Sequence, residues 1–197
     1  MIDLYVKNGK GVDVQPRFYQ AITAKKAIDL ENKSFVSAGW VDDHVHVYEK
    51  MTLYYDTPDL DGVDAGVTTI IDAGSTGADN LPDFYQITWD TKTNVFAMCN
   101  ISKTGIVAQD ELGDLSRVQG DLVREMIEQY SEFVVGIKVR MSKPVVGNNG
   151  ITPLRLAKEI QAANKNIPLM VHIGTNPPEL SDIFALLQQG YSITHWM

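Results

Sequence analysis

Hydrophobic positions follow two different patterns along the chain, and the change between them suggests two parts. Up to about residue 35 the apolar positions are short and alternating, as in "IDLYVKNG" (2–9) and "KAIDLENKSFV" (26–36). This pattern predicts short β segments joined by turns, one of them at Asn8-Gly9. Farther along, β-branched apolar runs alternate with longer amphipathic stretches. We therefore predict a β segment over residues 1–37 and a separate domain over residues 38–197.

Six apolar runs in the second part have the composition of buried strands. They cover residues 34–47, 66–74, 94–102, 133–141, 167–174 and 191–195. The stretches between them predict helices near 57–66, 81–91, 114–133, 152–165 and 177–190, with Thr152 capping the fourth. Alternation at roughly 30 residues per unit is typical of βαβ units and a parallel sheet. The fold class is α/β, and six strands fit an open doubly wound sheet or part of a TIM (β/α)8 barrel.

Composition narrows the possible partners and surroundings. The 197 residues carry a formal net charge of −8, and the pI is about 4.9. No basic cluster offsets this charge, so we expect no nucleic-acid partner. The opening residues are too charged for a signal peptide or membrane span, and the lone cysteine, Cys99, excludes an internal disulfide. These features predict a cytoplasmic protein with no nucleic-acid or membrane partner, and assembly into a homo-oligomer is left open.

Two histidines stand one residue apart in "VDDHVHV" (41–47), at the end of an apolar run. Side chains in a strand alternate between its faces, so Asp42, His44 and His46 share one face. Two imidazoles on one face can bind a single metal ion.

A lysine stands inside the apolar run "VVGIKVRM" (134–141), where Lys138 and Arg140 share one face. Burial lowers the pKa of a lysine and favours the neutral amine. Such an amine can react with carbon dioxide to give a carbamate, an oxygen ligand that bridges two metals. The alternative is a lysine that reaches solvent or pairs with a carboxylate. Arg140 could contact a substrate carboxylate, and an ion pair with a protein carboxylate is the alternative there.

The remaining two histidines also fall at ends of predicted strands, His172 in "IPLMVHIG" and His195 in "YSITH". A single histidine in such a place is more often structural than metal-bound. All four histidines share this placement, however, and together with Lys138 they form a consistent ligand set for one site. The joint interpretation is stronger than that of any one member.

These motifs resemble those of a known family. "GWVDDHVH" is similar to the D-x-H-x-H signature of the amidohydrolase superfamily. The wider runs "GVTTIIDAGSTGADN", "NISKTGIVAQDEL", "VVGIKVRMSKPVVGNNGITPL" and "IPLMVHIG" resemble its amidohydrolase/deacetylase group, whose members are described as dihydroorotase-like or D-aminoacylase-like. The resemblance covers some 150 residues, with the motifs in the family's order.

The resemblance implies a role for each matching residue. His44 and His46 match the first-strand pair that helps to hold the more buried metal. Lys138 matches a fourth-strand lysine that is carboxylated by CO2 in this family and bridges two divalent cations, commonly zinc. His172 and His195 match the ligands of the second metal. In the family, a metal-bound hydroxide attacks an amide or ester carbonyl.

The sequence also departs from the family pattern. The family's eighth strand carries an aspartate that binds metal and moves a proton, whereas this sequence ends at Met197. We therefore expect a C-terminally truncated barrel of strands 1–6 with an incomplete N-terminal β-sandwich, and no residue is assigned as catalytic. Asp42 or Asp72 could support the ligands from behind. Open sheet edges predict marginal stability.

Two functions from different classes follow, and the sequence leaves open whether this chain is an enzyme. The first is a metal-dependent amidohydrolase or deacetylase that hydrolyses an amide or ester bond of a small carboxylate-bearing or cyclic amide substrate. The second is an inactive remnant that binds at most one metal. A half-barrel subunit completed by another chain ranks third.

Overall fold

The computed structural model describes residues 3–7, 10–15, 23–31, 33–51, 53–106 and 110–195. The chain divides into two compact units, Met1–Ala38 and Gly39–Met197.

The first unit contains an antiparallel pair of strands, β1 (Asp3–Lys7) and β2 (Lys10–Gln15). Residues 26–31 and 33–36 form no strand, so the β segment predicted over residues 26–36 is wrong for these positions. Their side chains are exposed, and alternation alone does not make a strand without a neighbour to receive its hydrogen bonds. The predicted Asn8-Gly9 turn lies outside the described residues, and the β-sandwich stays a prediction.

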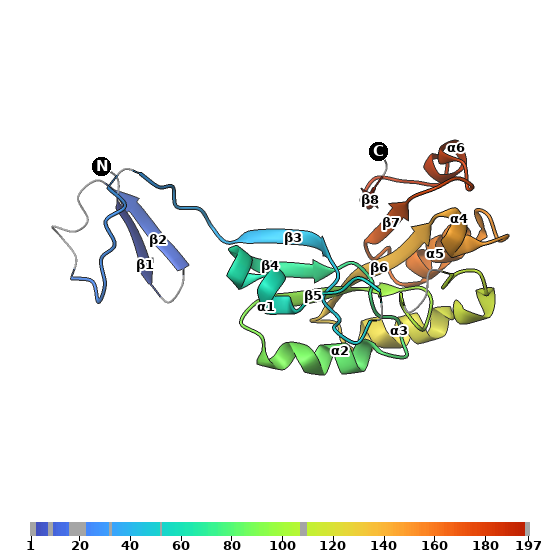
Figure 1. Ribbon diagram of the computed structural model, residues 1–197, viewed down its shortest axis with the longest axis horizontal. Coiled ribbons are helices and arrows are strands. Elements are labelled where there is room, and N and C mark those ends of the chain that lie inside the picture. Colours follow the sequence, from blue (N-terminus) through green and yellow to red (C-terminus); the bar gives the residue numbers. More distant parts are fainter. Residues whose placement is uncertain are drawn as a thin grey trace. The chain divides into compact units, whose positions relative to one another are not determined.

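The second unit is built on one parallel sheet whose strands follow chain order (Figure 1). The strands are β3 (Trp40–Val45), β4 (Val67–Asp72), β5 (Asn94–Asn100), β6 (Val134–Met141), β7 (Leu169–Ile173) and β8 (Tyr191–Thr194). A doubly wound sheet would reverse its order near the middle, and this one does not. The curled six-stranded half-barrel agrees with the predicted part of a (β/α)8 barrel.

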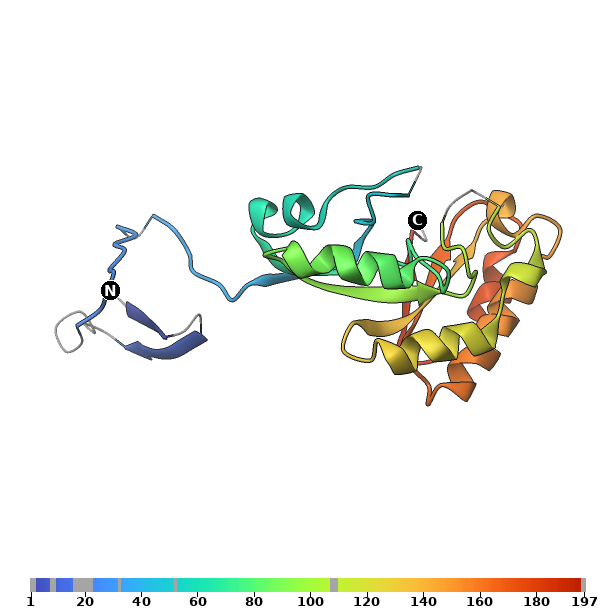
Figure 2. The ribbon, with the colours of Figure 1, turned by 90° about the horizontal axis from the view of Figure 1, so that it is seen from below.

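Three helices, α2 (Leu81–Ile87), α3 (Gly120–Gln129) and α5 (Thr152–Ala163), lie along the outside of the curled sheet (Figure 2). Shorter helices are α1 (Pro58–Asp61), α4 (Lys143–Val146) and α6 (Leu180–Phe184), with 3-10 turns at Val63–Ala65, Thr88–Asp90 and Leu115–Arg117. The main core fills the space between sheet and helices and includes Ile70, Phe84, Ile137 and Leu154, all with no exposed surface. Burying each such side chain stabilises the fold by about 1.5–3 kcal/mol.

Three predicted helices differ from those observed. The helix predicted over residues 114–133 is interrupted, because Val118 forms a bridge with Ser102 and separates Leu115–Arg117 from α3. The helix α5 begins at Thr152 itself, and Ile151 takes the N-cap position. The helix predicted over residues 177–190 is limited to α6. No helix in the described ranges is both long and apolar enough to cross a membrane.

Parallel strands in sequential order bring their carboxyl ends to one edge of the sheet. Adjacent strands are also in register at this edge, where Arg140 pairs with His172 and His172 pairs with Thr194. The predicted site residues therefore meet at this edge.

Candidate functional site

A cavity of about 470 Å³ lies at this end of the sheet. It is lined by His44, Val45, His46, Tyr54, Lys138, Arg140, His172 and His195. All five predicted ligands and Arg140 are in this set, although they lie on four strands or directly after them and span 152 positions of the sequence, from 44 to 195 inclusive. The structure thus brings them together, while their role as metal ligands stays a prediction.

The histidine rings form a connected group. The ring centroids of His44 and His46 are 5.6 Å apart, and those of His44 and His195 are 5.0 Å apart. The His172 and His195 centroids are also 5.0 Å apart. His195 has a left-handed backbone with φ of 62°, which is uncommon for a residue with a side chain. The His195 ring thus lies beside both His44, on the first strand of the sheet (β3), and His172, on its fifth strand (β7).

Three histidines at this site, His44, His46 and His172, favour the neutral form. Burial, assisted by the positive charge of Lys138, lowers the pKa of His44 to about 4. The same two causes lower the pKa of both His46 and His172 to about 3. A neutral imidazole keeps one nitrogen lone pair, which is the form that binds a metal ion.

Lys138 is fully buried in the middle of β6. Burial lowers its pKa to about 7, with the charge of Asp72 opposing the change and that of Arg140 adding to it. The lysine does not reach solvent, so this alternative from the sequence is wrong. At neutral pH a large fraction of the amine is therefore uncharged and nucleophilic.

The donor set itself tests whether a metal fits here. Within the described part of the chain, no three His, Cys, Asp or Glu side chains are placed to hold one ion together. An unmodified lysine amine adds little, because at this pKa it is partly protonated. A carbamate on Lys138 would add anionic oxygens next to neutral imidazoles, and this donor set suits zinc and similar divalent ions. The residues present fit a metal only with a modified Lys138.

Arg140 belongs to a buried ion pair that the sequence left as an alternative. Its Nε lies 2.6 Å from Glu111 Oε1 and its Nη2 lies 2.8 Å from Glu111 Oε2, a two-point contact. Burial raises the pKa of Glu111, and the bonds from Arg140 oppose that rise. The Nη1 group of Arg140 donates to the hydroxyl of Tyr54. The guanidinium therefore orients a phenol at the cavity wall.

Tyr54 and Glu111 were not identified from the sequence, because both lie in loops. The Tyr54 loop is fixed by a bond of 2.9 Å from the Asp56 N–H to the His46 carbonyl, which helps to bring the Tyr54 ring to 5.5 Å from that of His46. The Glu111 loop is held by Asn149, whose side chain donates to the Leu112 carbonyl. The motif "QDEL" lay within the matched region, but nothing in its pattern indicated a partner for Arg140.

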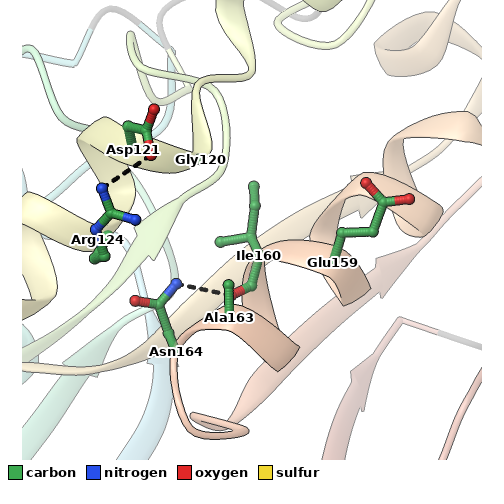
Figure 3. Close-up of a pocket in the computed structure, with 7 residues that line it drawn as sticks. All are labelled: Gly120, Asp121, Arg124, Glu159, Ile160, Ala163 and Asn164. Atoms are coloured by element: carbon green, nitrogen blue, oxygen red, sulfur yellow. Dashed lines mark hydrogen bonds and ion pairs between the residues drawn. The ribbon is translucent and has the colours of Figure 1, made fainter.

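A second hollow, of about 260 Å³, lies on the outside of the barrel between α3 and α5 (Figure 3). Arg124 there pairs with Asp121 at 3.0 Å, and the Asn164 amide donates to the Ile160 carbonyl. These polar groups bind each other, and none belongs to the predicted ligand set. We assign no chemistry to this hollow.

Comparison with known proteins finds relatives for this arrangement, although no family model matches the chain. A protein named deacetylase from Enterococcus faecalis is 55% identical over 206 aligned positions, which cover 98% of this chain and 56% of the relative. A deacetylase from Agrobacterium fabrum is 36% identical, over 89% of this chain and 44% of the relative. The chain thus spans about half the length of the curated relatives it matches.

Solved structures give the same picture. The crystal structure of an adenine deaminase superimposes with a TM-score of 0.91 at 55% identity, over 98% of this chain and 52% of that one. The crystal structure of a dihydroorotase superimposes with a TM-score of 0.75 at 35% identity, over 79% of this chain and 44% of that one. In both comparisons the sequence identity is higher than a shared fold alone would require.

Proposed function

We propose that this chain is an amidohydrolase-like, metal-dependent hydrolase of carbon–nitrogen bonds, with deacetylation as its reaction type. The similarity to proteins named deacetylase, to an adenine deaminase and to a dihydroorotase supports hydrolysis at such bonds. The substrate class is a small molecule that carries an N-acyl or O-acyl group next to a carboxylate, or a cyclic amide. A cavity of about 470 Å³ suits a molecule of that size.

One observation carries the proposal: four imidazoles and one buried amine line a single cavity. Basic groups whose pKa values are lowered by burial are costly to collect in one place unless a cation uses their lone pairs. In a purely structural cluster, the ring N–H groups of the histidines would more often donate hydrogen bonds to acceptor groups of the protein. Instead, Nδ1 of His172 is buried without a hydrogen-bond partner among the described residues.

His44, His46, Lys138, His172 and His195 would hold two divalent ions, zinc among them, with Lys138 carboxylated by CO2. When bound, such ions supply a hydroxide at neutral pH and polarise the carbonyl that it attacks. The chain's own part is to keep three of its imidazoles neutral. It also keeps the Lys138 amine uncharged often enough for CO2 to react with it. In that reaction the amine nitrogen bonds to the carbon of CO2 and loses one proton to water.

Arg140 and Tyr54 would then position the substrate. The Tyr54 hydroxyl accepts a bond from Arg140, so its own hydrogen can be donated to a substrate oxygen in the cavity. The charge of Arg140 is balanced by Glu111, which argues against Arg140 as the main partner of a substrate carboxylate. We therefore give Arg140 a positioning role and Tyr54 the direct contact.

Metal content and hydrolysis measured on the same preparation test the proposal. The 197-residue chain is loaded with zinc in bicarbonate buffer, and metal per chain is counted by mass spectrometry. Release of acetate is then followed with a panel of N-acetyl amino acids, O-acetyl hydroxy acids and cyclic amides. Two ions per chain and turnover support the proposal. Zero or one ion per chain without turnover contradicts the proposal and supports the inactive remnant instead.

A further inference from the structure

We propose that Ser75 and Asp72 fix the orientation and tautomer of His46, so that its Nε2 carries the free lone pair and its Nδ1 carries the hydrogen. This inference deepens the proposed function and rests on it, because it assigns the supporting residues of one ligand of the same site. Asp72 is the last residue of β4 and Ser75 lies in the loop after it, whereas His46 directly follows β3.

Three side chains form a continuous hydrogen-bonded chain. His46 Nδ1 lies 2.8 Å from Ser75 Oγ, and Ser75 Oγ lies 2.8 Å from Asp72 Oδ2. Asp72 has no exposed surface and Ser75 is 1% exposed. Water therefore has little access to either bond, and the two contacts are made by protein groups alone.

The direction of each bond follows from counting hydrogens. Asp72 Oδ1 accepts the Ser75 N–H at 2.7 Å, and Asp72 Oδ2 accepts the Val47 N–H at 2.9 Å. Burial raises the pKa of Asp72, but the two backbone donors and the Ser75 hydroxyl oppose this rise and favour the ionised carboxylate, which has no hydrogen of its own to give. The Ser75 hydroxyl has one hydrogen, and it must go to Asp72. The remaining bond can form only if His46 Nδ1 donates to Ser75 Oγ.

This assignment has a consequence for the site. When Nδ1 of a neutral imidazole holds the hydrogen, Nε2 is the unprotonated nitrogen that can bind a metal. A hydrogen bond on the other ring nitrogen is a common way for proteins to orient a metal-binding histidine, and its loss typically weakens metal affinity 10–100-fold. His172 offers an internal contrast, because its Nδ1 has no partner among the described residues.

The alternative is that Asp72 has a purely structural role and only holds the backbone of the two loops together. Asp72 bonds to the N–H groups of Val47 and Ser75, and in this way it ties the loop after β3 to the loop after β4. The substitution Ser75→Ala separates the two roles. It removes the hydroxyl and leaves both backbone bonds to Asp72 in place, so the structural role survives while the link to His46 is lost.

The test uses two measurements on the 197-residue chain. Long-range proton–nitrogen NMR spectra of the metal-free, ¹⁵N-labelled protein at pH 7 report which nitrogen of each imidazole is protonated, and a His46→Gln variant identifies the His46 signals. We expect Nδ1 of His46 to be protonated, and we expect Ser75→Ala to give a mixture of tautomers. Competition with a chelator should show zinc affinity 10–100-fold weaker in Ser75→Ala than in the parent chain.

Ser102→Ala is the matched control. Ser102 is also a fully buried serine after a sheet strand, but its hydroxyl contacts Thr104 instead of the site. It should keep both the His46 tautomer and the zinc affinity. A parent chain with His46 protonated at Nε2, or a Ser75→Ala variant with unchanged tautomer and affinity, overturns the inference. A parent chain that binds no zinc overturns the proposed function, and the metal-free spectra still decide the tautomer.

Discussion

The amine of Lys138 lies 3.1 Å from the sulfur of Met170, and the two residues are paired across the neighbouring strands β6 and β7. A thioether is a weak hydrogen-bond acceptor. The contact therefore does little to stabilise an ammonium group, and burial lowers the pKa of Lys138 to about 7. The sheet thus holds its lysine where the uncharged amine is favoured.

Lys138→Met should change how the stability of the metal-free protein depends on pH. Lowering the lysine pKa from 10.5 to about 7 corresponds to about 5 kcal/mol of unfolding free energy. Above pH 10.5 the amine is neutral in both states, so this cost is absent. As pH falls towards 7 the unfolded chain takes up the proton and the folded chain does not, which favours unfolding.

Urea unfolding in EDTA and CO2-free buffer between pH 7 and 10 measures this effect. Subtracting the Lys138→Met curve removes the contributions of other groups that titrate in the same range. We expect the unfolding free energy of the parent chain, relative to the variant, to fall by several kcal/mol as pH is lowered. Curves that stay parallel would show that the amine is not desolvated in the folded protein.

Lys138→Ala should abolish the binding of two metals, because the proposed bridging carbamate cannot form. Metal per chain after zinc loading in bicarbonate and gel filtration gives the answer directly. Lys92→Ala, a substitution of an exposed lysine outside the cavity, should load like the parent chain. Two ions retained in Lys138→Ala would remove the bridging role of this residue.

The parts of the site that the sequence predicted are those carried by strands. Alternation with a period of two placed Lys138 and Arg140 on one face, and both are buried. The ends of parallel strands share one edge of a sheet, which is why His172 and His195 could be expected near His44. Asp72 was considered as support for the ligands, and it bonds to Ser75, which contacts His46.

The parts that the sequence did not predict depend on loop conformation. Tyr54 reaches Arg140 because the Asp56 N–H donates to the His46 carbonyl, and no local pattern specifies that return of the chain. The prediction of one helix over residues 114–133 was wrong for a similar reason. Val118 has the right spacing for a helix, but a bridge to Ser102 holds it in an extended conformation. Long-range pairing overrides local periodicity at such positions.

Glu111→Gln should destabilise the metal-free protein by about 3–5 kcal/mol, because it leaves the buried guanidinium of Arg140 without its counter-charge. The side chains of Arg140 and Glu111 are only 5% and 1% exposed. Asp121→Asn breaks the exposed pair with Arg124 on α3 and should change stability by less than about 1 kcal/mol. Urea unfolding of both variants checks the contrast, and equal losses would contradict the buried character of the Glu111 pair.

Tyr54→Phe should lower turnover without changing metal content. The phenylalanine keeps the ring beside His46 and removes the hydroxyl that accepts from Arg140. If the hydroxyl contacts a substrate oxygen as charge develops on it, kcat should fall more than KM rises, by about 10²-fold or more. A change in KM alone would indicate a contact that is equally strong before and during the reaction.

Gly74→Ala should disrupt the site by a steric clash with the base of the Lys138 side chain, and Gly66→Ala is its matched control. Both glycines have left-handed φ values, 81° for Gly74 and 84° for Gly66. A Cβ at Gly66 meets no atom of the described residues within 4 Å, whereas a Cβ at Gly74 would lie 2.5 Å from Lys138 Cβ and 2.6 Å from Lys138 Cγ. These atoms are close to the β6 backbone and cannot swing away as the end of a side chain can.

The two substitutions therefore share one conformational cost and differ in a steric one. Gly66→Ala should lose about 1–2 kcal/mol of unfolding free energy from the left-handed backbone alone. Gly74→Ala should lose about 1–3 kcal/mol more from overpacking, and it should also bind less zinc because Lys138 is displaced. Urea unfolding in EDTA and metal counting measure the two effects separately. Equal losses of stability, with zinc binding intact, would mean that a Cβ at Gly74 fits beside Lys138, which this packing does not allow.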